Sequence, residues 1–116
     1  MIRTIIAALA ILISPAAIGQ ELKAVDLYTF CVSTSPIVQN VCSKYILGAV
    51  QGISLAAGKL GDKKTFCVPE DVSESVFVDT FVRTARADLA AYPQDKDIPA
   101  ISMVGSVIVH NFPCPQ

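Results

Sequence analysis

Four cysteines set the strongest constraint on what this 116-residue chain can fold into. They are Cys31, Cys42, Cys67 and Cys114, and all lie beyond an apolar N-terminal segment. An even number of cysteines in a small exported chain predicts disulfide bonds, here two, because a core of this size is only marginally stable without cross-links. A zinc site with four thiolate ligands is the alternative. Such sites usually contain two cysteines separated by two residues, and no such pair is present.

The N-terminal segment predicts that the chain is exported. A short basic start at Arg3 precedes an unbroken apolar run, Ile5–Ile13, and small residues lead up to Gly19. This order is typical of a secretory signal peptide. The run is too short for a membrane anchor, which needs about 20 apolar residues. We therefore expect a signal peptide over residues 1–19, cleaved near Gly19, and a single helical domain over residues 20–116 without membrane association after cleavage.

Composition excludes several classes of function. Nine lysine and arginine residues against ten aspartate and glutamate residues give a net charge of −1, without the basic excess of a nucleic-acid-binding domain. His110 is the single histidine, so no metal site with two histidines can form, and any nucleophile–histidine pair would depend on this residue. The acidic pairs Glu70/Asp71 and Asp95/Asp97 are typical of helix caps and solvated loops. We expect no catalytic residue, no metal, no cofactor and no nucleic-acid partner.

Hydrophobic periodicity predicts an all-α fold, a small disulfide-stapled bundle of about four helices. Apolar residues recur at three- and four-residue steps in about residues 20–30, 36–57 and 99–112, and in a helix between them. Asp71 or Ser73 would cap that third helix, and Pro93 would end it. Residues 76–78 and 104–109 are rich in β-branched side chains and allow a strand interpretation. No Asn-Gly or Asp-Gly hairpin turn separates these two stretches, so we favour helices.

An alternating arrangement of four helices predicts which cysteines pair. In such a bundle the end of the first helix and the start of the second share one pole. The start of the third helix and the end of the fourth share the other pole. Cys31 then lies near Cys42, and Cys67 near Cys114, which predicts two disulfides that each stabilise the fold by roughly 3 to 4 kcal/mol in the chain-entropy model.

Small residues repeat every four positions along the second expected helix, at Gly48, Gly52 and Ala56. An interior glycine costs roughly 0.5–1 kcal/mol relative to alanine, so two of them need a packing reason. One interpretation is a groove where another helix of the same chain crosses closely. The other is a contact face between two copies. We assign Tyr45, Gly48 and Gly52 to close helix packing or to a dimer face, and both interpretations stay open.

The order of several short motifs resembles that of a known protein family. These motifs are Cys42-x-x-Tyr45-x-x-Gly48-x-x-x-Gly52, Phe66-Cys67-Val68-Pro69, Tyr92-Pro93, Pro99-Ala100 and Phe112-Pro113-Cys114. Over about residues 27–114 the chain resembles the Rap/Tai immunity proteins, small periplasmic proteins that neutralise amidase effectors of type VI secretion systems. The resemblance implies an all-helical periplasmic protein, commonly a homodimer. It would bind a secreted peptidoglycan amidase and occlude the active site of that enzyme.

The resemblance also implies where the effector would bind. The connection between the last two long helices is the expected effector-facing loop, here residues 92–98. The residues expected to contact the partner are Tyr92, Pro93, Gln94, Asp95, Lys96 and Asp97. Pro93 and Pro99 stiffen the ends of the loop, so less conformational entropy is lost on binding. Tyr92 is the type of side chain enriched at binding hot spots. The alternative interpretation is an ordinary solvated turn between helices.

A second class of function stays open on the sequence alone. A small periplasmic chaperone or stress-response protein, without an amidase partner, would have the same size, export signal and cysteine content. Seven acidic residues between positions 70 and 97 would make such a protein sensitive to pH. Exposure of apolar surface in acid would favour this alternative, whereas a neighbouring amidase gene would favour the immunity interpretation.

Overall fold

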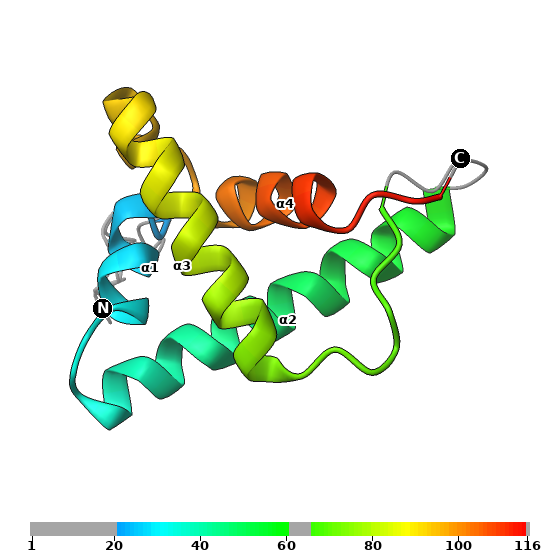
Figure 1. Cartoon of the computed structure of the whole chain (residues 1–116), viewed down its shortest axis with the longest axis horizontal. Helices are drawn as coiled ribbons and strands as arrows, with labels where there is room; N and C mark the ends of the chain where they lie inside the picture. The colour runs from blue at the N-terminus through cyan, green and yellow to red at the C-terminus, as the bar shows by residue number, and fades with distance from the viewer. Residues whose placement is uncertain (1–20, 61–65, 116) are drawn as a thin grey trace, which may run out of the picture.

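The computed structural model describes residues 21–60 and 66–115, and within them the fold consists of helices (Figure 1). The elements are α1 (Ala24–Cys31), α2 (Pro36–Leu60), α3 (Glu74–Ala91), the short 3-10 helix η2 (Pro93–Asp97) and α4 (Ala100–Asn111). The predicted all-α class is confirmed. Both stretches rich in β-branched residues lie inside helices, 76–78 in α3 and 104–109 in α4, so the strand interpretation is wrong. The predicted signal peptide lies outside the described residues.

The first helix begins later than the sequence pattern suggests. We expected it to start near residue 20, but α1 starts at Ala24 and the backbone at Lys23 is extended. The reason is a non-local contact. The Ala24 N–H donates to the Ile98 carbonyl at 2.8 Å, and the Ala100 N–H donates to the Leu22 carbonyl at 2.7 Å. Residues 22–24 therefore form a short antiparallel bridge with residues 98–100 in place of a helical turn.

The end of α2 and the cap at the start of α3 can be compared with the predictions from the sequence. We expected the second helix to stop at Gly58, but α2 continues to Leu60 because Gly58 keeps a helical backbone. Of the two candidate caps for α3, Ser73 is the one used. Its side-chain oxygen accepts a hydrogen bond from the Val76 N–H at 3.4 Å, which satisfies one of the free donors of the first turn.

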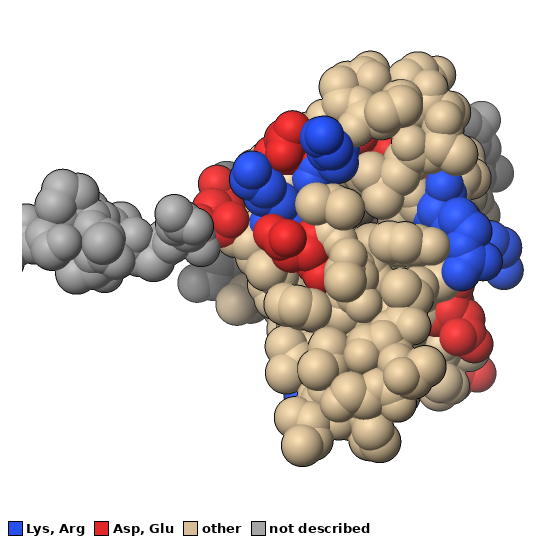
Figure 2. Space-filling view, turned by 90° about the vertical axis from the view of Figure 1, so that its left-hand side faces the viewer, with Lys and Arg blue, Asp and Glu red and all other residues tan. Residues whose placement is uncertain are grey.

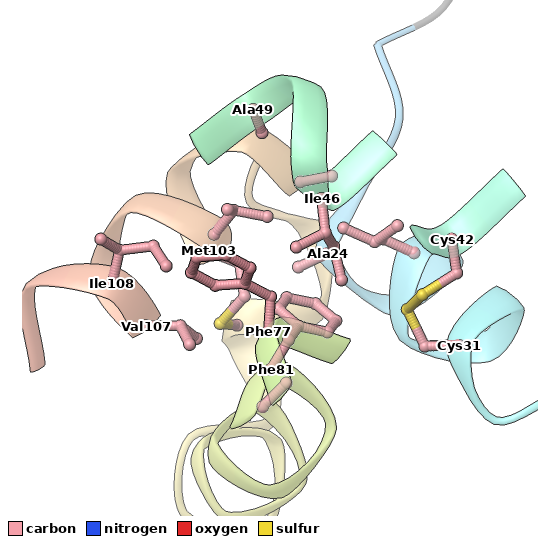
Figure 3. Packing of buried hydrophobic residues seen from close by; sticks show 14 of the residues in the cluster. Ala24, Cys31, Cys42, Ile46, Ala49, Phe77, Phe81, Met103, Val107 and Ile108 are labelled. Atoms are coloured by element: carbon pink, nitrogen blue, oxygen red, sulfur yellow. A yellow bond between two sulfur atoms is a disulfide. The ribbon is translucent and has the colours of Figure 1, made fainter. Parts of the chain in front are cut away.

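One hydrophobic core joins all four α-helices (Figure 3). Leu27 from α1, Ile46 from α2, Phe81 from α3 and Val104 from α4 are almost completely buried. Burial of one such side chain stabilises the fold by about 1.5–3 kcal/mol. At the edge of the core, the ring of Phe77 lies 5.7 Å from that of Phe112, which follows α4. The C-terminal segment therefore packs against the start of α3.

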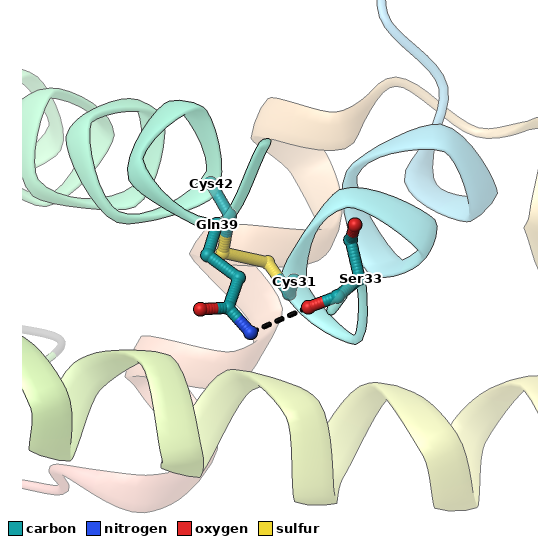
Figure 4. The surroundings of a disulfide bond; sticks show 4 residues. All are labelled: Cys31, Ser33, Gln39 and Cys42. Carbon is teal, nitrogen blue, oxygen red and sulfur yellow. Dashed lines mark hydrogen bonds between the residues drawn. A yellow bond between two sulfur atoms is a disulfide. The ribbon is translucent and has the colours of Figure 1, made fainter. Parts of the chain in front are cut away.

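Both predicted disulfides are present, Cys31–Cys42 and Cys67–Cys114. The first joins the end of α1 to the beginning of α2 (Figure 4). In the same turn the Gln39 side chain donates a hydrogen bond to the Ser33 carbonyl. The four-thiolate zinc alternative is wrong, because all four thiols are consumed in these two bonds.

The second disulfide has a different structural basis from the one we assumed. The helices cross one another at large angles instead of alternating as neighbours in an up-and-down bundle (Figure 1). Cys67 precedes α3 by several residues and lies in a non-helical segment, and Cys114 lies in the non-helical tail after α4. The Cys67 N–H donates to the Phe112 carbonyl at 2.7 Å, which aligns the two segments near the far end of α2.

Candidate functional site

The connection between α3 and α4 folds into a short ordered turn. Tyr92 ends α3, and its N–H donates to the Asp88 carbonyl at 2.7 Å. The next turn is 3-10 helical: the Asp95 N–H donates to the Tyr92 carbonyl at 2.9 Å, and the Ile98 N–H donates to the Asp95 carbonyl at 3.3 Å. Pro93 stands at the first position of η2, where its lack of an N–H costs no hydrogen bond. The predicted partner-binding residues thus belong to a continuous hydrogen-bonded segment.

The far end of this segment is held by the bridge between residues 22–24 and 98–100. We call this pairing the strap. The strap has two backbone hydrogen bonds and one ion pair. In the ion pair, the Lys23 ammonium lies 3.2 Å from a carboxylate oxygen of Asp97. Both side chains are more than half exposed, at 54% and 57%, so this ion pair adds at most about 1 kcal/mol. The backbone bonds of the strap, and not the ion pair, fix where the segment leaves the core.

The predicted partner-binding residues differ in exposure. Tyr92 has 56% of its surface exposed, and Pro93, Gln94, Lys96 and Asp97 are also exposed. Asp95 is partly buried, and its carboxylate lies close to that of Asp88. The surface seen in Figure 2 carries acidic and basic side chains next to one another, separated by uncharged areas. On that face no large area carries a single sign of charge.

Asp88 is a residue of this site that the sequence analysis missed. Burial raises the pKa of the Asp88 carboxyl, and hydrogen bonding and repulsion with Asp95 raise it further. Two carboxylates can share a hydrogen bond only when one of them holds a proton. The Asp88 Oδ2 atom is itself buried and has no hydrogen-bond partner among the residues that the structure describes.

A groove of about 400 Å³ opens between α3 and α4 beside this carboxylate. Its polar or ionisable lining residues are Thr84, Asp88, Tyr92, Ser106 and His110. Tyr92 belongs to both features, because it lines the groove and is also the first residue of the 92–97 segment. His110, the single histidine of the sequence, stands in the last turn of α4.

The glycines of α2 do not seat another helix of this chain. A side chain added at Gly48 or Gly52 would meet nothing within 4 Å in the described part of the molecule. The interpretation as intramolecular close packing is therefore wrong for both glycines. The reason is the orientation of α2, which turns Cys42, Ile46 and Ala49 towards the core and leaves the glycines exposed.

The exposed side of α2 carries several apolar side chains, with the charged side chain of Lys44 among them. Ile37 is 79% exposed, Val41 48% and Leu55 64%, and Ile101 of α4 is 40% exposed beside them. We call these four side chains, together with Tyr45, Gly48 and Gly52, the α2 face. A hollow of about 400 Å³ lies in this face, lined by Lys44, Tyr45, Gly48, Ala49 and Ile101.

Tyr45 connects the α2 face to the interior. It is partly buried and packs against the core cluster. Burial, and to a lesser degree the negative charge of Glu21, raise the pKa of its phenol. The hydroxyl therefore stays protonated at neutral pH and is a hydrogen-bond donor at the edge of the apolar hollow.

Within residues 21–60 and 66–115, no three acidic, histidine or cysteine side chains gather in a way that could hold a metal ion. None of the helices described is long and apolar enough to cross a membrane. The described surface includes an ordered exposed segment, a groove lined in part by Asp88, and a helix face with several exposed apolar side chains.

Comparison with known proteins gives one match. The model of the family described as Rap1a immunity proteins matches residues 23–114. The match starts at the strap and ends at the second disulfide, so it includes the 92–97 segment, the groove and the α2 face. No curated protein and no solved structure matches the chain significantly.

Proposed function

Because the chain belongs to the family of Rap1a immunity proteins, we propose that it binds a secreted peptidoglycan amidase in the periplasm and blocks the active site of that enzyme. Membership in the family makes it an immunity protein, whose partner is a secreted effector protein. The amidase activity of the effector, its delivery by a type VI secretion system and the lack of catalysis by this chain are parts of the proposal.

One observation carries the choice of binding site, namely the way in which the 92–97 segment is held. Its side chains are mostly exposed, while its backbone is fixed to α3 at one end and to the strap at the other. A segment that is already ordered loses little conformational entropy when it binds. Tyr92 supplies an exposed aromatic side chain, and Asp97 and Lys96 supply charge beside it.

Inhibition of this kind needs no chemistry from the inhibitor. An amidase that uses a cysteine activated by a histidine must admit the peptide of peptidoglycan into its cleft. A rigid segment that fills the cleft excludes the substrate without reacting. The 92–97 segment suits this role because its 3-10 turn presents consecutive side chains from a narrow support.

We also propose that the protein forms a homodimer through the α2 face. Contiguous exposed apolar surface on a soluble protein is typical of an interaction site. Gly48 and Gly52 would let the backbones of two α2 helices approach closely, since nothing in the described chain occupies the space above them. The α2 face and the 92–97 segment involve different residues, so dimerisation would leave the segment free for the effector.

The disulfides support an oxidising compartment for the mature protein. Two disulfides in a chain of this size are typical of exported proteins. The periplasm, and cleavage of a signal peptide near Gly19, remain predictions from the N-terminal sequence and from the family resemblance. Sequencing the N-terminus of the protein purified from the periplasm tests both.

The test of function is co-expression of the protein with a candidate amidase directed to the periplasm, with cell lysis as the readout. Gln94→Trp puts a bulky side chain on the exposed 92–97 segment and should abolish protection. Ser54→Trp, at an exposed position of α2 away from the segment, is the control and should protect fully. Asp97→Ala should mainly slow association and change its salt dependence, as expected for a charge at the rim.

Calorimetric titration with the purified amidase measures the same variants directly. Wild-type affinity for Gln94→Trp would remove the 92–97 segment from the mechanism. If the wild-type protein binds no amidase encoded near it and protects against none, the amidase proposal fails. The chaperone alternative would then be tested by suppression of client aggregation in acid.

A further inference from the structure

The groove between α3 and α4 is a second surface feature next to the 92–97 segment. Its polar and ionisable lining comes from Thr84, Asp88 and Tyr92 on one side and from Ser106 and His110 on the other. Its floor includes the buried side chains of two α4 residues, Met103 and Val107. The groove therefore combines an apolar floor with polar groups at its edges, as ligand sites usually do.

The Asp88 carboxylate has unused capacity to accept hydrogen bonds. Its Oδ2 atom has almost no solvent-accessible surface and no partner among the described residues. A buried carboxylate oxygen without a partner is costly, because it has given up water and gained nothing in return. The terminal torsion of an aspartate is broad, so either carboxylate oxygen can turn towards the groove that the residue lines.

The surroundings of Asp88 are negative, and no lysine or arginine of the described residues forms an ion pair with it. The carboxylate of Asp95 faces it, and the C-terminal end of α3 adds the negative end of a helix dipole. The last turn of α3 contains no basic residue. Arg86, two positions before Asp88, donates instead to the Tyr28 hydroxyl at 3.0 Å. The ion pairs found in residues 21–60 and 66–115 join Lys23 to Asp97 and Lys44 to Glu74.

We propose that this groove receives a cationic side chain, an arginine or lysine of the effector, with Asp88 as its acceptor. The apolar floor would cover the aliphatic stem of such a side chain, and the exposed ring of Tyr92 would lie beside the charged end. An arginine fits best, because its planar guanidinium makes charge-assisted, bidentate bonds to a carboxylate. The inference rests on the proposed function, because it supposes that the effector covers the 92–97 segment and thereby reaches the groove.

The first test needs no effector. The protein labelled with ¹⁵N is titrated with N-acetyl-arginine amide, and with N-acetyl-citrulline amide, which has the same shape without the charge. The arginine compound should shift the amide signals of Asp88, Tyr92, Ser106 and His110, whereas the citrulline compound should not. Equal shifts with both compounds, or shifts confined to residues outside the groove, would overturn the proposal.

Variants separate the groove from general electrostatics. Asp88→Asn should weaken binding of the arginine compound at least tenfold. Asp79→Asn, which removes the same charge from an exposed position of the same helix, should leave the affinity unchanged. Ser106→Leu blocks the groove from α4 without touching Asp88 and should also abolish binding, which guards against a folding defect in the Asp88 variant. Unchanged affinity in both groove variants would refute the site.

The second test distinguishes this inference from the proposed function. The affinity of each variant for the purified amidase is measured beside that of Gln94→Trp. If Gln94→Trp fails to bind and Asp88→Asn binds as tightly as the wild-type protein, the blocking segment stands and the groove is not part of the interface. If the wild-type protein binds no amidase at all, the proposed function fails, and the arginine titration alone still decides whether the groove takes a cation.

Discussion

The 92–97 segment and the α2 face are both exposed, but they are built in opposite ways. The segment has a short 3-10 backbone, mostly polar side chains and a strap that holds it to the start of α1. The α2 face has regular helical backbone and apolar side chains such as Ile37 and Leu55, which form no hydrogen bonds with water. A polar, rigid protrusion suits recognition of a specific cleft, whereas an apolar helix face suits burial against a similar surface.

Under the proposed function, the two regions have separate tasks, recognition of the effector and self-association. If the separation is correct, a change in one region should leave the function of the other intact. A variant that alters both the oligomeric state and the affinity for the effector would contradict the division.

The largest effect is expected on the α2 face. Replacing Ile37 and Val41 together by lysine should weaken the dimer by at least about 3 kcal/mol, since a symmetric dimer loses four apolar side chains and each contributes up to about 1.5–3 kcal/mol when fully buried. Both side chains are exposed in the single chain, so thermal unfolding of the monomer should change little. Analytical ultracentrifugation measures the dissociation, and Ser54→Lys, an exposed change elsewhere on α2, is the control. A dimer of unchanged affinity would place the interface elsewhere.

The next effect concerns the segment. Tyr92→Ala should weaken effector binding by about 2 kcal/mol or more, the value expected for an aromatic anchor at a hot spot. Calorimetric titration gives the affinity, and ultracentrifugation should report an unchanged dimer. Because the Tyr92 ring is exposed, the melting temperature should shift only slightly. If Tyr92→Ala binds the effector as tightly as the wild-type protein, other residues make the main contact with the effector.

A smaller effect distinguishes the dimer face from the fold itself. Gly52→Leu has room in the single chain and replaces a poor helix former, so it should stabilise the monomer by up to about 0.8 kcal/mol. The same side chain would keep two α2 helices apart and reduce dimerisation. Thermal melts combined with light scattering separate the two effects. A destabilised monomer would show that the glycine is covered within the chain.

The smallest effect is expected from the acidic pair beneath the segment. The pKa of Asp88 is raised in the folded state, so the folded protein binds this proton more tightly than the unfolded chain does. The contribution of Asp88 to stability should therefore grow as the pH falls through its folded pKa, and it should be unfavourable above that value. Asp88→Asn should raise the melting temperature slightly at neutral pH and lose this advantage in acid. An identical pH dependence in both proteins would show that Asp88 is not perturbed.

Local sequence patterns were sufficient for the fold class, whereas the cysteine pairing was predicted correctly from a helix arrangement that the structure does not have. Amphipathic periodicity determines helices directly, because one face must meet the core. The pairing was predicted correctly from an alternating bundle, although the helices cross and Cys67 lies outside α3. Either arrangement brings Cys67 close to Cys114, so the prediction did not depend on the crossing angles.

Non-local packing explains what the sequence could not reveal. The strap shortens α1 through backbone bonds between residues 22–24 and 98–100, and backbone bonds leave no sequence pattern. The repeat of Gly48 and Gly52 indicates a shared face but not whether that face points inwards. Asp88 resembles any other acidic helical residue until η2 brings Asp95 against it. The partner-binding role of residues 92–97 came from the family resemblance and stays a prediction.

The second disulfide has a consequence for how the protein survives proteases. Cys67 and Cys114 are 47 positions apart, and the covalent ring that they close contains α3, the 92–97 segment and α4. A peptide bond cut in the exposed segment would therefore open the ring without releasing either fragment, because the disulfide still joins the two pieces. Such a nick would be invisible on a non-reducing gel and would appear as two bands after reduction. Cleavage within the exposed 92–97 segment therefore cannot separate the protein into two fragments while the Cys67–Cys114 disulfide is intact.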